Sequence, residues 1–275
     1  MIAARMLFLA GAGWTFLTVV AAAALVSLAS GVEAVARGAD RVVLGGLAQV
    51  PEVLVPLSPV LVLLGAALTA AWMDSRGERT ALQALGLGPT RTGISIAIVG
   101  TWIGFVQLRV ANDGLHAIDA WKRAQTVSED WVWLPDWRAI QPERNVAVAA
   151  ANGDVIPADP YIEPEVLDHA IQALKPSTAS RWTLHESKGR LAQIEWHARR
   201  ARVLACALLC FLGWLPLGAS AERQVLTALG IGIAYLSVDT FLRSFAGWGH
   251  LPVVVGSWAT PVVTAIAVSV WSRRG

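Results

Sequence analysis

Apolar residues gather along the chain in long blocks that are separated by short polar stretches. Six blocks approach the about 20 apolar residues that a helix needs to cross a bilayer. The first block is far longer than the apolar region of a secretory signal, so we expect a retained helix. We therefore predict an α-helical membrane protein with six transmembrane helices, three before and three after an insertion. They are expected at residues 7–32, 53–73, 92–110, 203–218, 225–245 and 251–271.

One long polar segment, residues 111–200, separates the first three apolar blocks from the last three. Asn152-Gly153 lies between two runs of strand-forming residues, which is typical of a tight hairpin. A helical pattern follows over residues 164–175, and residues 190–202 fit either a strand or an extension of the fourth helix. We predict a small, mainly β α+β domain. The predicted domains are residues 1–110, 111–200 and 201–275.

The composition agrees with this interpretation. The chain is 55% hydrophobic and only 15% charged, with a mean hydropathy of +0.53. These values exclude a disordered chain and are not those of a soluble enzyme, whose surface needs more charge. The net charge of +2 also gives no indication of a nucleic-acid partner, which would favour a strongly basic protein.

The placement of arginines predicts the orientation, because cytoplasmic loops carry an excess of basic residues. If both termini are cytoplasmic, three arginines lie on the opposite side, Arg37, Arg41 and Arg243. Three more, before the fourth helix, follow a long translocated segment, which largely escapes the rule. The cytoplasmic side then holds the larger set: Arg5, Arg76, Arg79, Arg91, Arg223, Arg273 and Arg274.

Motifs for covalent chemistry are absent from the sequence. It contains no phosphate-binding G-x-x-x-x-G-K-[ST] loop, no G-x-S-x-G and no H-E-x-x-H. The five histidines lack metal-ligand spacing, and Cys206 and Cys210 in an apolar helix are more often packing residues than a redox pair. We therefore expect no catalytic residue, no metal site and no cofactor in this chain.

The connector between the second and third blocks, residues 75–86, has the features of a short cytoplasmic helix. Ser75 and Glu78 fit a capping box, and Gly86 followed by Gly88-Pro89 predicts the end of the helix. Such a helix either docks into a groove on a soluble partner or packs on its own bundle. We expect Ala81, Leu82 and Leu85 to be presented beside a charged first turn. The candidate coupling residues are Ser75, Arg76, Glu78, Arg79, Leu82 and Leu85.

Three stretches of the sequence resemble one family. Ser58–Gly65 leads through Asp74–Glu78 to Ala81-Leu82-Gln83-Ala84-Leu85-Gly86. Glu195–Arg200 is followed by Leu215-Pro216-Leu217-Gly218, and Gly249-His250-Leu251-Pro252 precedes the last apolar block. In this order, around one insertion, they resemble the permease subunits of the lipopolysaccharide export ABC transporter, the LptF/LptG type.

The resemblance implies a function. Permeases of this family have three helices, a periplasmic β-jellyroll and three more helices, and they pair around a cavity in the bacterial inner membrane. A separate cytoplasmic ATPase dimer contacts their coupling helices, here through Glu78, and lipopolysaccharide passes to a periplasmic bridge protein. The insertion here is shorter than the family's, so we expect a reduced jellyroll and a divergent member.

Charged residues near the expected outer surface are candidates for binding a phosphorylated headgroup, since arginine holds phosphate bidentately. Each arginine could equally be an interfacial anchor. Asp239 and Arg243 are four residues apart in the fifth block, so they form either a cavity-lining pair or local charge compensation. The candidate set is Arg37, Arg41, Arg109, Arg199, Arg200, Arg202, Asp239 and Arg243.

Two other functions compete with the permease. One is a structural adaptor whose outer domain binds a periplasmic partner without moving lipid. The other is a lipid-modifying enzyme that uses Asp239, His197 or Glu195 as acid or base, which the lack of a convergent nucleophile and base disfavours.

Overall fold

The computed structural model describes most of the apolar blocks and the strands of the insertion. Two compact units are formed, Met1–Leu108 with His197–Gly275, and Arg109–Trp196. The expected helix at 164–175 and the expected turn at Asn152-Gly153 lie outside the described residues. The described residues are 2–36, 42–115, 132–133, 138–141, 146–149, 155–157, 190–218 and 220–272.

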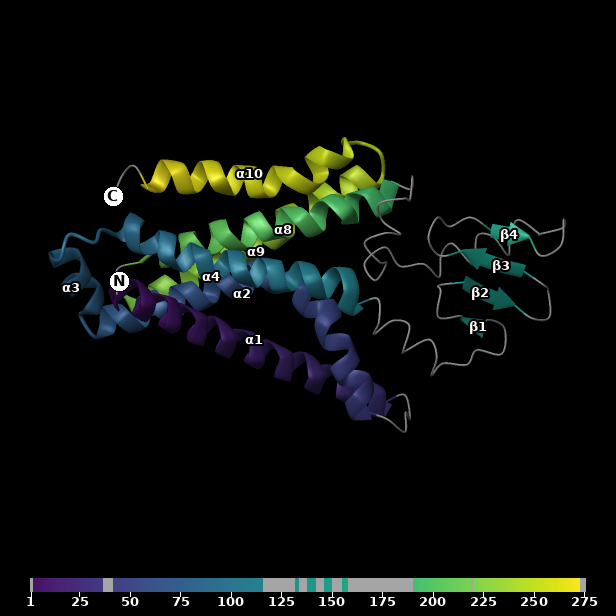
Figure 1. Cartoon of the computed structure of the whole chain (residues 1–275), viewed down its shortest axis with the longest axis horizontal. Helices are drawn as coiled ribbons and strands as arrows, with labels where there is room; N and C mark the ends of the chain where they lie inside the picture. Colours follow the sequence, from purple (N-terminus) through teal and green to yellow (C-terminus); the bar gives the residue numbers. More distant parts are fainter. Residues whose placement is uncertain are drawn as a thin grey trace. The chain divides into compact units, whose positions relative to one another are not determined.

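Long helices make up the first unit (Figure 1). Among the described residues, five helical stretches are apolar and long enough to cross a membrane: Leu9–Ser27, Val50–Ser75, Pro89–Gly114, Ala221–Gly247 and Val253–Trp271. The predicted α-helical membrane protein is thus confirmed. The helices are α1 (Ile2–Ala36), α2 (Val42–Ser75), α3 (Glu78–Ala84), α4 (Pro89–Arg109), α8 (Arg190–Trp214), α9 (Ala221–Gly247) and α10 (Val253–Ser272).

The expected fourth span corresponds to the apolar second half of α8. This helix starts well before the apolar block, at Arg190, so residues 190–202 extend the fourth helix and do not form a strand. Its first half carries five charged side chains, which keeps α8 out of the set of apolar spans. The sixth span therefore stays a prediction.

Helix α2 lies at the centre of the bundle. Two thirds of its most apolar stretch is buried, against about a tenth for α1. One core cluster joins Leu63 and Ala67 of α2 to α8 and α9. The other joins α2 to α4 and α8 around Ile96 and Trp214. At Gly213 the backbone of α8 meets the carbonyl oxygen of Leu63 so closely that no side chain fits, as is typical of packed membrane helices.

The second unit contains a short π-helix, Val110–Gly114, and a four-stranded antiparallel sheet. The strands are β1 (Val132–Trp133), β2 (Arg138–Gln141), β3 (Val146–Ala149) and β4 (Val155–Pro157), and they pair in sequence order. Strands β3 and β4 pair with Val148 opposite Val155, on either side of the expected hairpin turn. These two strands lie where the sequence predicts them, while a periplasmic β-domain stays a prediction.

Candidate functional site

The connector between α2 and α4 is the short helix α3, at one end of the bundle (Figure 1). Its first residue is Glu78, and its N-cap is Gly77 with a φ of 71° and no side-chain cap. Ser75 belongs to the last turn of α2, where its hydroxyl donates to the carbonyl oxygen of Trp72 at 2.7 Å. The expected capping box is therefore wrong, because the turn at Arg76-Gly77 leaves Ser75 on the preceding helix.

The end of α3 is the one expected. Gly86 has a φ of 77°, a left-handed conformation that glycine adopts without steric cost. Its amide donates to the carbonyl oxygen of Gln83, and the amide of Leu87 donates to that of Leu82. These two bonds make a Schellman motif, which satisfies carbonyl groups that the helix end leaves open.

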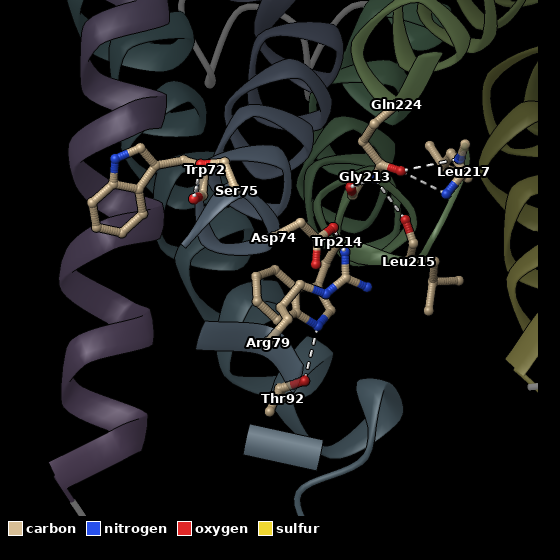
Figure 2. Close-up of polar contacts among 11 residues, drawn as sticks. Trp72, Asp74, Ser75, Arg79, Thr92, Gly213, Trp214, Leu215, Leu217 and Gln224 are labelled. Carbon is tan, nitrogen blue, oxygen red and sulfur yellow. Dashed lines mark hydrogen bonds and ion pairs between the residues drawn. The ribbon is translucent and has the colours of Figure 1, made fainter. Parts of the chain in front are cut away.

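Arg79 anchors α3 to the bundle (Figure 2). It is only 5% exposed, and its Nη1 lies 2.8 Å from Oδ2 of Asp74 at the end of α2. Its guanidinium also lies 5.0 Å from the ring centre of Trp214, the last residue of α8. The Trp214 indole in turn donates to the hydroxyl of Thr92 in the first turn of α4, at 2.9 Å. One arginine and one tryptophan thus join α3 to α2, α4 and α8.

The other expected coupling residues take two orientations. Leu82 packs against the buried cluster around Met73 and Trp214, while Leu85 is 76% exposed. Glu78 is half-buried, and the exposed Arg76 lies over the ring of Trp72 at 4.2 Å. Besides Leu85, the exposed face of α3 consists of Thr80, Ala81, Gln83 and Ala84.

A buried glutamine, Gln224, holds the turn between α8 and α9 beside this end of the bundle. Its amide nitrogen donates to the carbonyl oxygens of Gly213 and Leu215, at 3.0 and 2.7 Å. Its amide oxygen accepts from the backbone amides of Leu217 and Gly218 (Figure 2). The single side chain of Gln224 thus binds two carbonyl groups before Pro216 and two amides after it, and fixes this turn to the first turn of α9.

The expected ion pair within the fifth span is present. Nη2 of Arg243 lies 2.6 Å from Oδ2 of Asp239, and both side chains are largely buried. Arg202 of α8, itself 6% exposed, also acts electrostatically on Asp239. This buried group of charges joins α8 to α9.

The remaining expected headgroup residues are spread over different environments. Arg199 is 1% exposed, whereas Arg200 on the neighbouring face of α8 is exposed. Arg109 belongs to the second unit, is exposed and lies 3.7 Å from Asp113. Arg37 and Arg41 lie outside the described residues.

Four residues of this site were missed by the sequence reasoning: Asp74, Thr92, Trp214 and Gln224. A signal existed only for Asp74, as an acidic residue at a predicted helix end and five residues before an arginine. Thr92, Trp214 and Gln224 reach the site through packing between helices far apart in the sequence, which a local pattern does not contain.

The comparison with known families supports the permease among the competing functions. Residues 156–274 match the family described as lipopolysaccharide export system permease LptF/LptG. This C-terminal part of the chain, 119 of its 275 residues, is similar to the LptF/LptG permease family. The matched stretch contains α8, α9 and α10, while α3 precedes it. A search of the curated proteins gives no match to the chain.

The match supports a function at a coarse level, that of a subunit of a lipopolysaccharide export permease. Together with the apolar helices, it indicates a multi-pass protein of the inner membrane.

Proposed function

We propose that this chain extracts lipopolysaccharide or a related glycolipid from the inner membrane, driven by ATP that a separate ATPase dimer hydrolyses. Helix α3 is the docking element for that ATPase. The observation that carries this proposal is the two-sided character of α3. Its outer face, including Leu85, is exposed, while Arg79 and Leu82 fix its inner face to the bundle.

The contacts of Arg79 supply a route for the motion of α3. A displacement of α3 acts on the end of α2 through Asp74 and on the end of α8 through Trp214. Trp214 passes it to the start of α4 through Thr92. Packed and hydrogen-bonded groups can carry coupling between distant sites, and these three contacts form a continuous series.

The proposal extends to the partners and the orientation. Both termini and α3 lie in the cytoplasm, and the segment 111–200 lies in the periplasm, where it meets a bridge protein. A second permease completes the cavity, and the arginines of the candidate set line the route of the anionic headgroup. The chain itself holds no cofactor, since the nucleotide site belongs to the ATPase.

Charge reversal at Glu78 tests the docking role. Glu78→Ala and Glu78→Lys are expected to reduce the amount of ATPase that co-purifies with the permease pair, and to abolish transport. The physical reason is the loss of an acidic contact at the start of α3, replaced in the lysine variant by repulsion from a basic groove. Pull-down from native membranes and glycolipid release from vesicles measure the two effects.

The matched control is Glu222→Lys. Glu222 lies in the first turn of α9 and is more exposed than Glu78. It changes the charge by the same amount without touching α3 and is expected to leave ATPase association intact. Normal co-purification and transport in both Glu78 variants would contradict the docking role. Purification of the native assembly without any ATPase would instead favour the structural adaptor.

A further inference from the structure

An apolar groove runs between α9 and α10 within the helical unit. It has a volume of about 410 Å³ and extends along α9 from Thr227 to Leu242, with α8 behind it. The opposite wall is the stretch of α10 from Ala259 to Trp271. The groove closes where the two helices touch, because Gly256 of α10 lies against Ala246 and the carbonyl oxygen of Leu242. It is therefore a one-ended slot whose mouth lies at the start of α9.

The length and the lining of the slot suit a hydrocarbon chain. Fifteen residues of helix from Thr227 to Leu242 rise about 23 Å, so the slot extends over much of a hydrocarbon core of about 30 Å. Its walls are largely apolar, which is the environment that a lipid chain prefers.

The mouth of the slot carries a positive charge. Arg223 is exposed, lies one helical turn before Thr227, and has no acidic partner among the described residues. Its Cβ lies against Gly218, next to Leu217, which lines the slot. The neighbouring Glu222 is about 100° around the helix. Trp271, at the mouth on α10, is of the residue type found at membrane interfaces.

We propose that the slot between α9 and α10 holds one acyl chain of an anionic phospholipid, with its phosphate against Arg223. The apolar walls bury the chain, and each buried methylene adds to the binding. The exposed guanidinium binds the phosphate by charge-assisted hydrogen bonds. The mouth is at the α3 end of the bundle, because Gln224 beside Arg223 bonds to the last turns of α8 that also hold Arg79. The site is therefore supplied from the leaflet on that side.

Native mass spectrometry of the purified permease complex tests the slot. After delipidation, phosphatidylglycerol or phosphatidylcholine is added to wild type and to Ala234→Trp, in which the indole fills the slot from the α9 wall. We expect retention of phosphatidylglycerol by wild type, and a loss of about tenfold in the variant because the chain contacts are removed. The control is Ser237→Trp, which introduces the same side chain at an exposed α9 position outside the slot.

Arg223→Gln tests the headgroup contact, with Arg91→Gln as the control at an exposed arginine of α4. Only Arg223→Gln is expected to remove the preference for phosphatidylglycerol over phosphatidylcholine.

Should Ala234→Trp unfold the protein, photocrosslinking tests the slot in wild type. A diazirine on the acyl chain of phosphatidylglycerol is expected to label peptides of α9 and α10. Equal lipid retention in Ala234→Trp and Ser237→Trp, labelling of other helices, or retention of the exported glycolipid in place of phospholipid would overturn the proposal.

Discussion

The two members of the Asp74–Arg79 ion pair are buried to different extents, so their removal is expected to affect stability differently. The guanidinium is buried, whereas the Asp74 side chain is about half exposed. Asp74→Ala therefore leaves a buried cation without its partner, and we expect a loss of about 1–3 kcal/mol in the free energy of unfolding. Arg79→Met leaves a carboxylate that water can reach and keeps an apolar contact with Trp214, so it is expected to cost less. Thermal unfolding of both variants in detergent gives the order, and the reverse order would show that the stacking on Trp214 dominates.

The pair Asp239 and Arg243 lies deeper, and both of its members are largely buried. Asp239→Leu or Arg243→Met alone removes one member of the buried pair, which costs about 3–5 kcal/mol in buried ion pairs. The double variant is expected to lose less than the sum of the two single losses, since the second substitution no longer breaks the pair. A double-mutant cycle followed by thermal unfolding measures this coupling. Additive losses would mean that Arg202, the second cation acting on Asp239, carries the compensation.

The start of α3 depends on the backbone conformation of one glycine. Gly77 has a positive φ, and a Cβ added there would meet no other atom, so strain is the only cost of a side chain. Gly77→Ala is expected to destabilise this turn by about 1–2 kcal/mol, and Gly77→Asn by less. The control is Gly88→Ala. A Cβ at Gly88 also meets no other atom, but Gly88 has no positive φ, so this substitution is expected to leave the free energy of unfolding unchanged. A neutral Gly77→Ala in the same unfolding assay would contradict the role of backbone strain in this turn.

The sequence predicts helix ends well only when one local signal dominates. Gly86 with Gly88-Pro89 located the end of α3 correctly, because a left-handed glycine followed by proline leaves the backbone little choice. At the start, a capping box at Ser75 competed with a glycine turn at Gly77, and the glycine turn won. The anchoring of α3 could not be predicted, since Trp214 and Thr92 are 122 residues apart in sequence.

At the scale of the whole molecule, apolar blocks located five spans but left the fourth undecided. Helix α8 packs closely on its neighbours along one side, where Ala198, Ala201, Ala205, Cys206 and Leu209 have no exposed surface. A helix that packs on other helices needs less apolar surface than one facing lipid, so hydropathy underestimates it. The first half of α8 buries two charged residues, Arg199 and Arg202, among small apolar ones, which lowers its hydropathy further.

Contacts at both ends of α8 favour the sixth span, and we predict that α8 crosses the membrane beside α9. Near its start, His197 accepts from the indole of Trp258 in the first turns of α10 at 3.5 Å, and near its end Gly213 accepts from Gln224 in the first turn of α9. Helix α8 rises about 36 Å over its 25 residues, enough for the hydrocarbon core of about 30 Å. Helix α8 contacts the start of α9 at one end and α10, which follows the end of α9, at the other. We therefore predict that it spans the same layer as α9.

Six crossings place both termini on one side, whereas five place them on opposite sides. We therefore expect green fluorescent protein fused after Gly218 or at Gly275 to fluoresce, because both positions are cytoplasmic in a six-span arrangement. Alkaline phosphatase is expected to be active only when fused after Gly249, between α9 and α10. A fusion after Ala84 is the internal reference for the side of α3. If phosphatase is active after Gly218, α8 does not cross, the turn held by Gln224 faces the periplasm, and the ATPase on α3 cannot act on the end of α8.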